Sequence, residues 1–173
     1  ACPEALLSCA STMDSADQTL ASTREPFALA WSAPFRSASG LAVLGAHQRL
    51  AVRSDERFIH LLDVRTGKTQ SAINGGEILS QSISADADDN IYVTGRKVHS
   101  FSAAGFERWS VALADTEPGP ASAPIIGNGL VYVLTPTTLQ ALATSHGGQR
   151  WARPVKNDFA GQAAGRGDTL VIP

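Results

Sequence analysis

The stretch GLVYVLTPTTLQALATSHGGQRW, residues 129–151, decides the fold. It opens with a run of β-branched and aromatic residues, passes a Thr-Pro-Thr segment, and continues through a second apolar run to a Gly-Gly pair and a Trp. Short β-branched segments bounded by turn residues are typical of strands and not of helices. The stretch therefore predicts strands at 129–135 and 138–143, and a further strand at 149–155.

The same pattern recurs along the chain with a period near 40 residues. Tyr132 has counterparts at Ala51, Tyr92 and Val171, and these four positions are spaced by 41, 40 and 39 residues. Turn residues at about 84–89 and 125–128 separate each such strand from a preceding one. Each unit therefore consists of four strands, and four antiparallel strands repeated in this way are typical of the blades of a β-propeller.

Two further markers keep the same period. One is the third-strand segment at 59–62, 98–101 and 139–142, spaced by 39 and 41 residues, and the other lies on the fourth strand of each unit. The turn before the fourth strand contains a glycine, where the backbone is expected to need a positive φ. The fourth-strand markers are Trp31, Gln70, Trp109 and Trp151, and the turn glycines are Gly67, Gly105, Gly147 and Gly148.

The predicted fold class is all-β, a propeller or part of one. Residues 1–17 are expected to form a tether or loop, and blades follow over 18–173. The expected units are a half blade at 18–33, whole blades at about 38–72, 79–113 and 120–155, and a half blade at 159–173. The two half blades are complementary, which leaves two possibilities open. They pair to close a ring of four blades, or the chain is part of a ring of six to eight whose other blades come from another chain, a second copy or further sequence.

These residues resemble the quinoprotein-type, or PQQ-like, propeller repeat, in which G-x-V-Y-V is followed by L-x-A-L-D-A-x-x-G-x-x-x-W. Residues 129–151 match this pattern, and residues 59–67 match it with Asp63 retained before Gly67. The repeat Asp is replaced by Ser102 and Ala143 in the other two units, and the Trp by Gln70 in one. The resemblance covers about residues 31–173 and implies a propeller with degenerate blades.

The resemblance says less about function, because it is shared by quinoprotein dehydrogenases and by outer-membrane-assembly propellers. The dehydrogenases carry an adjacent cysteine pair, a catalytic Asp and calcium ligands, and this chain has no adjacent cysteines. We therefore expect no catalytic residue and no cofactor. The resemblance favours a non-catalytic scaffold outside the cytoplasm, periplasmic, on the cell surface or secreted. The alternative is an enzyme subunit that holds a quinone or small ligand at the ring centre.

Composition excludes other classes. A net charge of −2 over 173 residues argues against a general nucleic-acid binder, and 43% hydrophobic residues argue against a disordered chain. No apolar run is long enough for a transmembrane helix. We expect a protein partner or a second copy.

Two local features remain open. Asp86, Asp88 and Asn90 alternate before a strand, as oxygen ligands do in calcium loops. The EF-hand pattern is excluded because Ile91 and Lys97 stand where it needs Gly and Glu, so a hydrophilic turn is the simpler interpretation. Cys2 and Cys9 fit no zinc pattern and are expected to form a local disulfide, or else to be unrelated thiols.

Overall fold

The computed structural model describes residues 29–35, 38–54, 57–76, 83–113, 122–155, 164–166 and 169–171. The chain divides into two units, Ala1–Ala30 and Trp31–Pro173. The predicted tether at 1–17, Cys2 and Cys9 all lie outside the described residues. The strands of the described residues all belong to the second unit.

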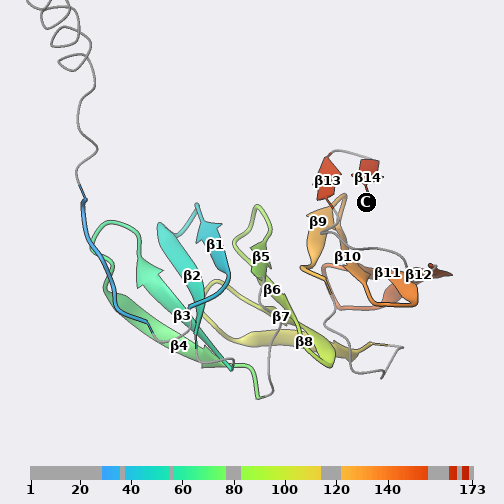
Figure 1. The fold of residues 1–173 in the computed structure, drawn as a ribbon, viewed down its shortest axis with the longest axis horizontal. Coiled ribbons are helices and arrows are strands. Elements are labelled where there is room, and N and C mark those ends of the chain that lie inside the picture. Colours follow the sequence, from blue (N-terminus) through green and yellow to red (C-terminus); the bar gives the residue numbers. More distant parts are fainter. Residues whose placement is uncertain are drawn as a thin grey trace, which may run out of the picture. The chain divides into compact units, whose positions relative to one another are not determined.

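Three four-stranded antiparallel sheets, here called blades 1 to 3, follow one another along the chain, and a hairpin follows them (Figure 1). Blade 1 contains β1 (Leu41–Leu44), β2 (Arg49–Ser54), β3 (Phe58–Asp63) and β4 (Thr69–Asn74). Blade 2 contains β5 (Ile83–Ala85), β6 (Ile91–Thr94), β7 (Lys97–Phe101) and β8 (Glu107–Ala112). Blade 3 contains β9 (Ile125–Gly127), β10 (Leu130–Leu134), β11 (Thr138–Ala143) and β12 (Gln149–Pro154), and the hairpin is β13 (Ala164–Arg166) with β14 (Thr169–Val171).

Each blade repeats the same register. Strands pair in chain order, and the pairing of the third strand with the fourth shifts once in every blade. The shift falls at Leu61/Leu62, at Ser100/Phe101 and at Ala141/Leu142. No helix occurs among the residues described. The all-β, partial-propeller prediction is confirmed.

The period-two alternation of a strand sends side chains to opposite faces of a blade. In β6, Ile91 and Val93 belong to the apolar cluster between blades 1 and 2, whereas Tyr92 belongs to the cluster between blades 2 and 3. We call the face toward the preceding blade the leading face and the face toward the following blade the trailing face. A blade thus has two apolar faces, and each interface joins a trailing face to a leading one.

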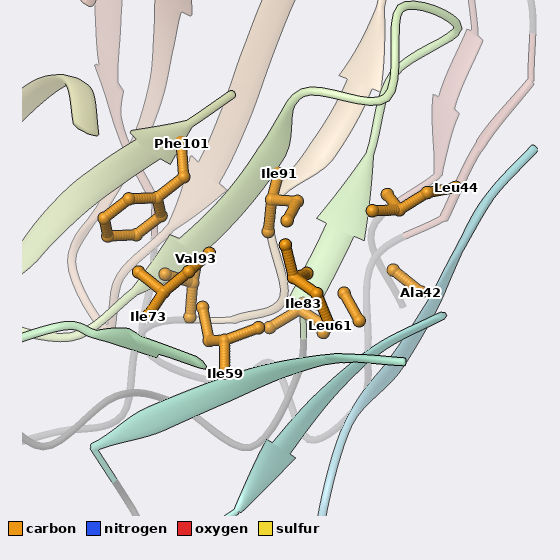
Figure 2. Close-up of a cluster of buried hydrophobic side chains, with 10 residues drawn as sticks. Ala42, Leu44, Ile59, Leu61, Ile73, Ile83, Ile91, Val93 and Phe101 are labelled. Carbon is orange, nitrogen blue, oxygen red and sulfur yellow. The ribbon is translucent and has the colours of Figure 1, made fainter. Parts of the chain in front are cut away.

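The core consists of these two interfaces. Between blades 1 and 2 lie Ala42, Leu44, Ala51, Ile59, Leu61, Ile73, Ile83, Ile91, Val93 and Phe101 (Figure 2). Between blades 2 and 3 lie Tyr92, Val98, Trp109, Leu113, Val131, Val133 and Leu142.

The predicted half blades have different outcomes. Most of residues 18–33 lies outside the described residues, and residues 29–35 carry no strand. At the other end, β13 and β14 form a two-stranded antiparallel sheet, and β13 contacts β9, the first strand of blade 3.

Candidate functional site

Two tryptophans each dock on the blade that follows them in the chain, at the turn between that blade's third and fourth strands. The Trp31 indole N–H donates to the Val64 carbonyl, and the Trp109 N–H donates to the Thr144 carbonyl, both at 2.9 Å. Gly67 allows the first approach, because a Cβ there would lie 2.3 Å from Cε3 of Trp31. The Trp109 contact joins blade 2 to blade 3, and the Trp31 contact joins the segment before blade 1 to that blade.

The equivalent turn of blade 2 is held differently. The register places Trp109 opposite Ser100, Trp151 opposite Ala141, and Ser71 opposite Leu61. The repeat Trp is therefore replaced by Ser71 in blade 1, and the sequence alignment on Gln70 is wrong by one residue. Ser71 lies four positions after Gly67, as Trp109 does after Gly105, whereas Gln70 lies only three positions after Gly67.

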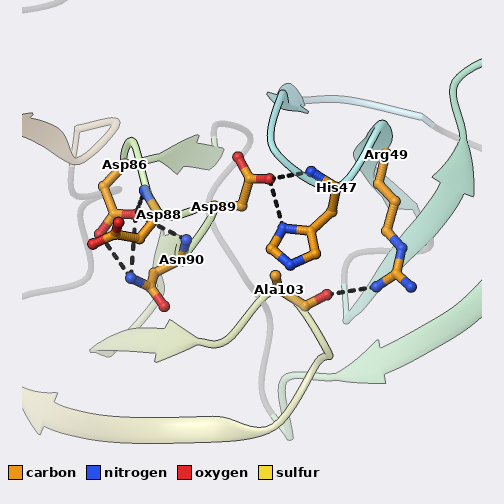
Figure 3. A network of polar contacts seen from close by, with 7 residues as sticks. All are labelled: His47, Arg49, Asp86, Asp88, Asp89, Asn90 and Ala103. Atoms are coloured by element: carbon orange, nitrogen blue, oxygen red, sulfur yellow. Dashed lines mark hydrogen bonds and ion pairs between the residues drawn. The ribbon is translucent and has the colours of Figure 1, made fainter.

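Arg49 takes over the missing contact. Its guanidinium donates to the Ala103 carbonyl at 2.9 Å (Figure 3). Ala103 follows Ser102 as Val64 follows Asp63, so the carbonyl accepts from the preceding blade at the same place in the turn. Arg49 lies on β2 of blade 1, so the bridge still runs from blade 1 to blade 2.

The turn residues singled out in the sequence lie as follows. Asp63 Oδ1 accepts from the Thr66 hydroxyl at 2.9 Å and from the backbone N–H groups of Thr66 at 2.9 Å and Arg65 at 3.0 Å, and these bonds lower the pKa of Asp63. Gly67 and Gly105 have φ of 67° and 89°. In blade 3 the left-handed position is Gly147, at φ 72°, and not the neighbouring Gly148.

Two Tyr–Trp pairs show that the trailing face of blade 3 is less buried than the trailing face of blade 2. Tyr92 and Trp109 have ring centroids 5.9 Å apart, as do Tyr132 and Trp151. Tyr92 is fully buried between blades 2 and 3, whereas Tyr132 and Trp151 on blade 3 are only partly buried. The guanidinium of Arg153 lies 5.8 Å from the Trp151 ring centroid.

The candidate calcium residues form a turn closed by their own hydrogen bonds. Asp86 Oδ1 accepts from the backbone N–H groups of Asp88 at 3.0 Å and Asn90 at 2.9 Å (Figure 3). Asp86 Oδ2 accepts from the Asn90 side chain at 3.0 Å and the Tyr92 hydroxyl at 2.7 Å. A cation at Asp86 would have to compete with these donors. Among the described residues, no group of three or more His, Cys, Asp or Glu side chains is placed to hold a metal.

This turn also joins blade 1 to blade 2. Asp89 Oδ2 lies 2.8 Å from both the backbone N and the ring Nδ1 of His47. Asp89 is 2% exposed and has φ 60°. Sequence reasoning missed His47, Asp89 and Arg49, because no local pattern links residues 42 or 54 positions apart.

The leading face of blade 1 is covered in part, since Leu62 is 1% exposed and Phe35 contacts His60, but its first strand is open. Leu41 and Val43 on β1 are 60% and 64% exposed, and Phe58 on β3 is 37% exposed. The equivalent of Leu41 in blade 2 is Ile83, by the register against Val52 and Val93, and it is only 7% exposed. Blade 1 therefore carries side chains of the blade-packing type that no blade in the described part of the chain covers.

A cavity of about 350 Å³ lies where blade 1 meets blade 2. Its lining comes from the end of β4 and from β7 and β8, and none of it from the first strands β1, β5 and β9. The His99 ring stacks on Phe101 with an interplanar angle of 8°, and His99 Nδ1 lies 3.5 Å from the Glu107 carboxylate. The lining residues are Asn74, Gly75, Gly76, Lys97, His99, Phe101, Glu107 and Ser110.

Searches of family models and of curated proteins give no match to this chain. In the part that the structure describes, no helix is long and apolar enough to span a membrane.

Solved structures do match. The crystal structure of BamB from Moraxella catarrhalis superposes with a TM-score of 0.62 at 16% identity, over 76% of this chain and 42% of that chain. A quinohemoprotein alcohol dehydrogenase from Comamonas testosteroni gives a TM-score of 0.58 at 17% identity, over 73% of this chain and 23% of the other. A second such dehydrogenase, from Pseudomonas putida HK5, gives a TM-score of 0.58 at 16% identity, over 73% and 22%.

This chain thus spans less than half the length of each of these proteins. At such identities the likeness concerns the fold. It agrees with the repeat pattern, with the three sequential four-stranded sheets and with the tryptophans that dock on the next blade. By its fold, the chain is a partial β-propeller.

Proposed function

We propose that the chain is a non-catalytic scaffold outside the cytoplasm that binds or assembles other proteins through protein–protein contacts. The observation that carries this proposal is the exposed first strand on the leading face of blade 1, where Leu41 and Val43 are 60% and 64% exposed. Contiguous exposed apolar side chains mark interaction surfaces, because their burial by a partner is favourable. The resemblance to extracytoplasmic propellers supports the compartment.

The rest of the unit supports a scaffold. Blades 1 and 2 are joined by an apolar cluster, by the His47–Asp89 contact and by the bond from Arg49 to Ala103. Such an interface fixes the relative positions of the turns at the blade ends. Turns on a fixed frame are the usual place for recognition.

Site-specific photo-crosslinking tests the proposal. A benzophenone amino acid replaces Val43 in one variant and Phe106 in a matched control, since Phe106 is 75% exposed but lies in the β7–β8 turn and not on the face with Leu41. We expect crosslinks from position 43 to a defined protein in cells of the source organism, identified by mass spectrometry, and fewer from position 106. Equal or absent crosslinking at both positions would contradict the proposal.

The alternative of a small-ligand or quinone-binding subunit is favoured by one observation, the cavity between blades 1 and 2. Its lining combines an aromatic ring at Phe101 with His99 and Glu107. Addition of a quinone with calcium to the purified chain is the test. Saturable binding, seen as an absorbance change that is lost in Phe101→Ala, supports this alternative, and no saturable change argues against it.

A further inference from the structure

The β9–β10 hairpin turns on two residues, Asn128 and Gly129. Gly127 pairs with Leu130, and the two residues between them have φ of 52° and 72°. Asn-Gly is a preferred pair for such a turn, because both of its positions need a positive φ. In the same pair the backbone nitrogen of the glycine can approach the asparagine side chain with little hindrance, because glycine has no Cβ. The turn therefore holds the two groups that react when an asparagine deamidates.

Deamidation here needs only the chain and water. The backbone nitrogen of Gly129 loses its proton and forms a bond to Cγ of Asn128. The Cγ–Nδ2 bond breaks, and Nδ2 takes up one proton and leaves as ammonia. Water then opens the resulting succinimide ring at either of its carbonyls, which leaves aspartate or isoaspartate. No atom is oxidised or reduced.

The chain contains a second Asn-Gly pair, Asn74–Gly75, at the end of β4. Gly75 is buried, and its N–H donates to the Arg57 carbonyl at 2.9 Å. Asn74 Oδ1 accepts from the Gly76 N–H, also at 2.9 Å. The attacking nitrogen and the attacked side chain are thus both engaged, and the reaction would first have to break both hydrogen bonds.

The attacking nitrogen is placed differently in the β9–β10 turn. In the part of the chain that the structure describes, none of the backbone hydrogen bonds outside the strands is donated by the Gly129 N–H. Gly129 is held through its carbonyl instead, which accepts from the Thr144 N–H at 3.0 Å and from the Thr144 hydroxyl at 3.1 Å. Asn128 and Gly129 are both exposed, and a Cβ on Gly129 would meet nothing within 4 Å. The turn therefore has the space to rearrange for the attack.

We infer that Asn128 is a site of spontaneous deamidation, and that the hydrogen bonds around Asn74 protect the second pair. This inference goes beyond the proposed function and does not depend on it. Isoaspartate lengthens the backbone of the turn by one carbon, so the two bonds from Thr144 to Gly129 would be disturbed. Because the Thr144 carbonyl accepts the indole N–H of Trp109 at 2.9 Å, a change there reaches the contact between blades 2 and 3.

Peptide mapping by mass spectrometry of the folded chain, incubated at mildly alkaline pH, is the test. Deamidation replaces an amide nitrogen by oxygen, which changes the peptide mass, and chromatography separates isoaspartate from aspartate. We expect Asn128 to convert about ten times faster than Asn74 or more, and a factor of ten corresponds to about 1.4 kcal/mol in the barrier. The same chain unfolded in urea is the control, because there the hydrogen bonds around Asn74 are lost. In urea the two sites should convert at similar rates.

Asn128→Gly is the matched variant, since Gly-Gly also suits this turn and offers no side chain to attack. After the same incubation we expect the unchanged chain to unfold at a lower urea concentration than before, and Asn128→Gly to keep its midpoint. Similar rates at the two sites in the folded chain would overturn the inference. So would a difference that persists in urea, because sequence and not structure would then cause it. An equal shift of the midpoint in Asn128→Gly would overturn the effect assigned to blade 3.

Discussion

At the scale of single residues, two glycines with the same backbone separate two physical effects. Gly129 and Gly147 both have φ 72°. A Cβ on Gly129 would meet nothing within 4 Å, whereas a Cβ on Gly147 would lie 2.7 Å from both Trp109 Cε3 and Val111 Cγ2. The first glycine is needed for the backbone alone, and the second also for the close approach of the preceding blade.

Alanine at these positions should therefore cost different amounts. Gly129→Ala is expected to lower the free energy of unfolding by about 1–2 kcal/mol, the cost of a left-handed L-residue. Gly147→Ala is expected to lower it by about 1–3 kcal/mol more, because the interface with Trp109 is overpacked. Urea unfolding of both variants measures the difference. Equal losses would mean that the indole moves aside at little cost.

Asp86 links stability to pH. Burial raises its pKa, but the hydrogen bonds from the side chains of Asn90 and Tyr92 outweigh burial and leave the pKa of Asp86 below its ordinary value. The same environment raises the pKa of Tyr92 to about 12, through burial first and then through the bond to Asp86. Because the pKa of Asp86 is lower in the folded chain than in the unfolded one, its carboxylate stabilises the fold above the unfolded value of about 4.

This stabilisation is lost as the pH falls through the lowered folded pKa. We expect Asp86→Asn to reduce stability near neutral pH and to flatten the loss of stability below about pH 4. Asp88→Asn is the control, because Asp88 lies in the same turn and is exposed. This variant should keep the acid profile of the unchanged chain. Urea unfolding at a series of pH values measures both. Parallel profiles for the two variants would contradict the role given to Asp86.

At the scale of elements, one carbonyl in each turn between third and fourth strands accepts a bond from a side chain of the preceding blade or, for blade 1, of the segment before it. The acceptors are Val64, Ala103 and Thr144, and the donors are Trp31, Arg49 and Trp109. The repeat thus conserves an acceptor position within this chain while the donor changes. The partial loss of the repeat Trp does not leave blade 2 without this contact.

Arg49→Ala should consequently destabilise the chain. We expect a loss of about 1.5–3 kcal/mol in the free energy of unfolding, the range for a hydrogen bond with a charged donor. Arg150→Ala is the control, because Arg150 is an exposed arginine at the start of β12. Equal losses for the two variants would show that the bond from Arg49 to Ala103 contributes little.

The elements themselves could be predicted from the sequence, because each strand is a local pattern bounded by turn residues. Tyr92 and Tyr132 marked their strands correctly, and both lie on second strands. The fourth strand of blade 1 was misaligned at Gln70, since Ser71 shares no side-chain property with tryptophan and only the strand register shows their equivalence. Glycine spacing likewise could not separate Gly147 from Gly148, because only the backbone φ distinguishes them.

The contacts between blades were beyond the reach of sequence. The pair of His47 and Asp89 and the bond from Arg49 depend on how one sheet is placed against the next, and nothing in a 40-residue repeat encodes a partner one repeat away. The exposure of β1 was equally hidden, because Leu41 and Ile83 have the same character in sequence. They differ only in whether a blade lies in front of them.

At the scale of the whole unit, this difference in coverage sets the local stability. Blade 2 is packed on both faces, and Ile91, Tyr92 and Val93 on β6 are fully buried. On blade 1, by contrast, Leu41 and Val43 are 60% and 64% exposed. In a repeat protein each unit is stabilised by its own contacts and by its interfaces with neighbours, so a blade with two interfaces should open less often than a blade with one.

Hydrogen exchange followed by mass spectrometry measures this directly. At low protein concentration we expect the amides of β6 and β7 to exchange more slowly than those of β1 and β2, because opening of blade 2 breaks two interfaces and opening of blade 1 breaks one. Equal exchange in β2 and β6 at low concentration would mean that the three blades open as one cooperative unit. The number of buried faces of a blade would then not determine its local stability.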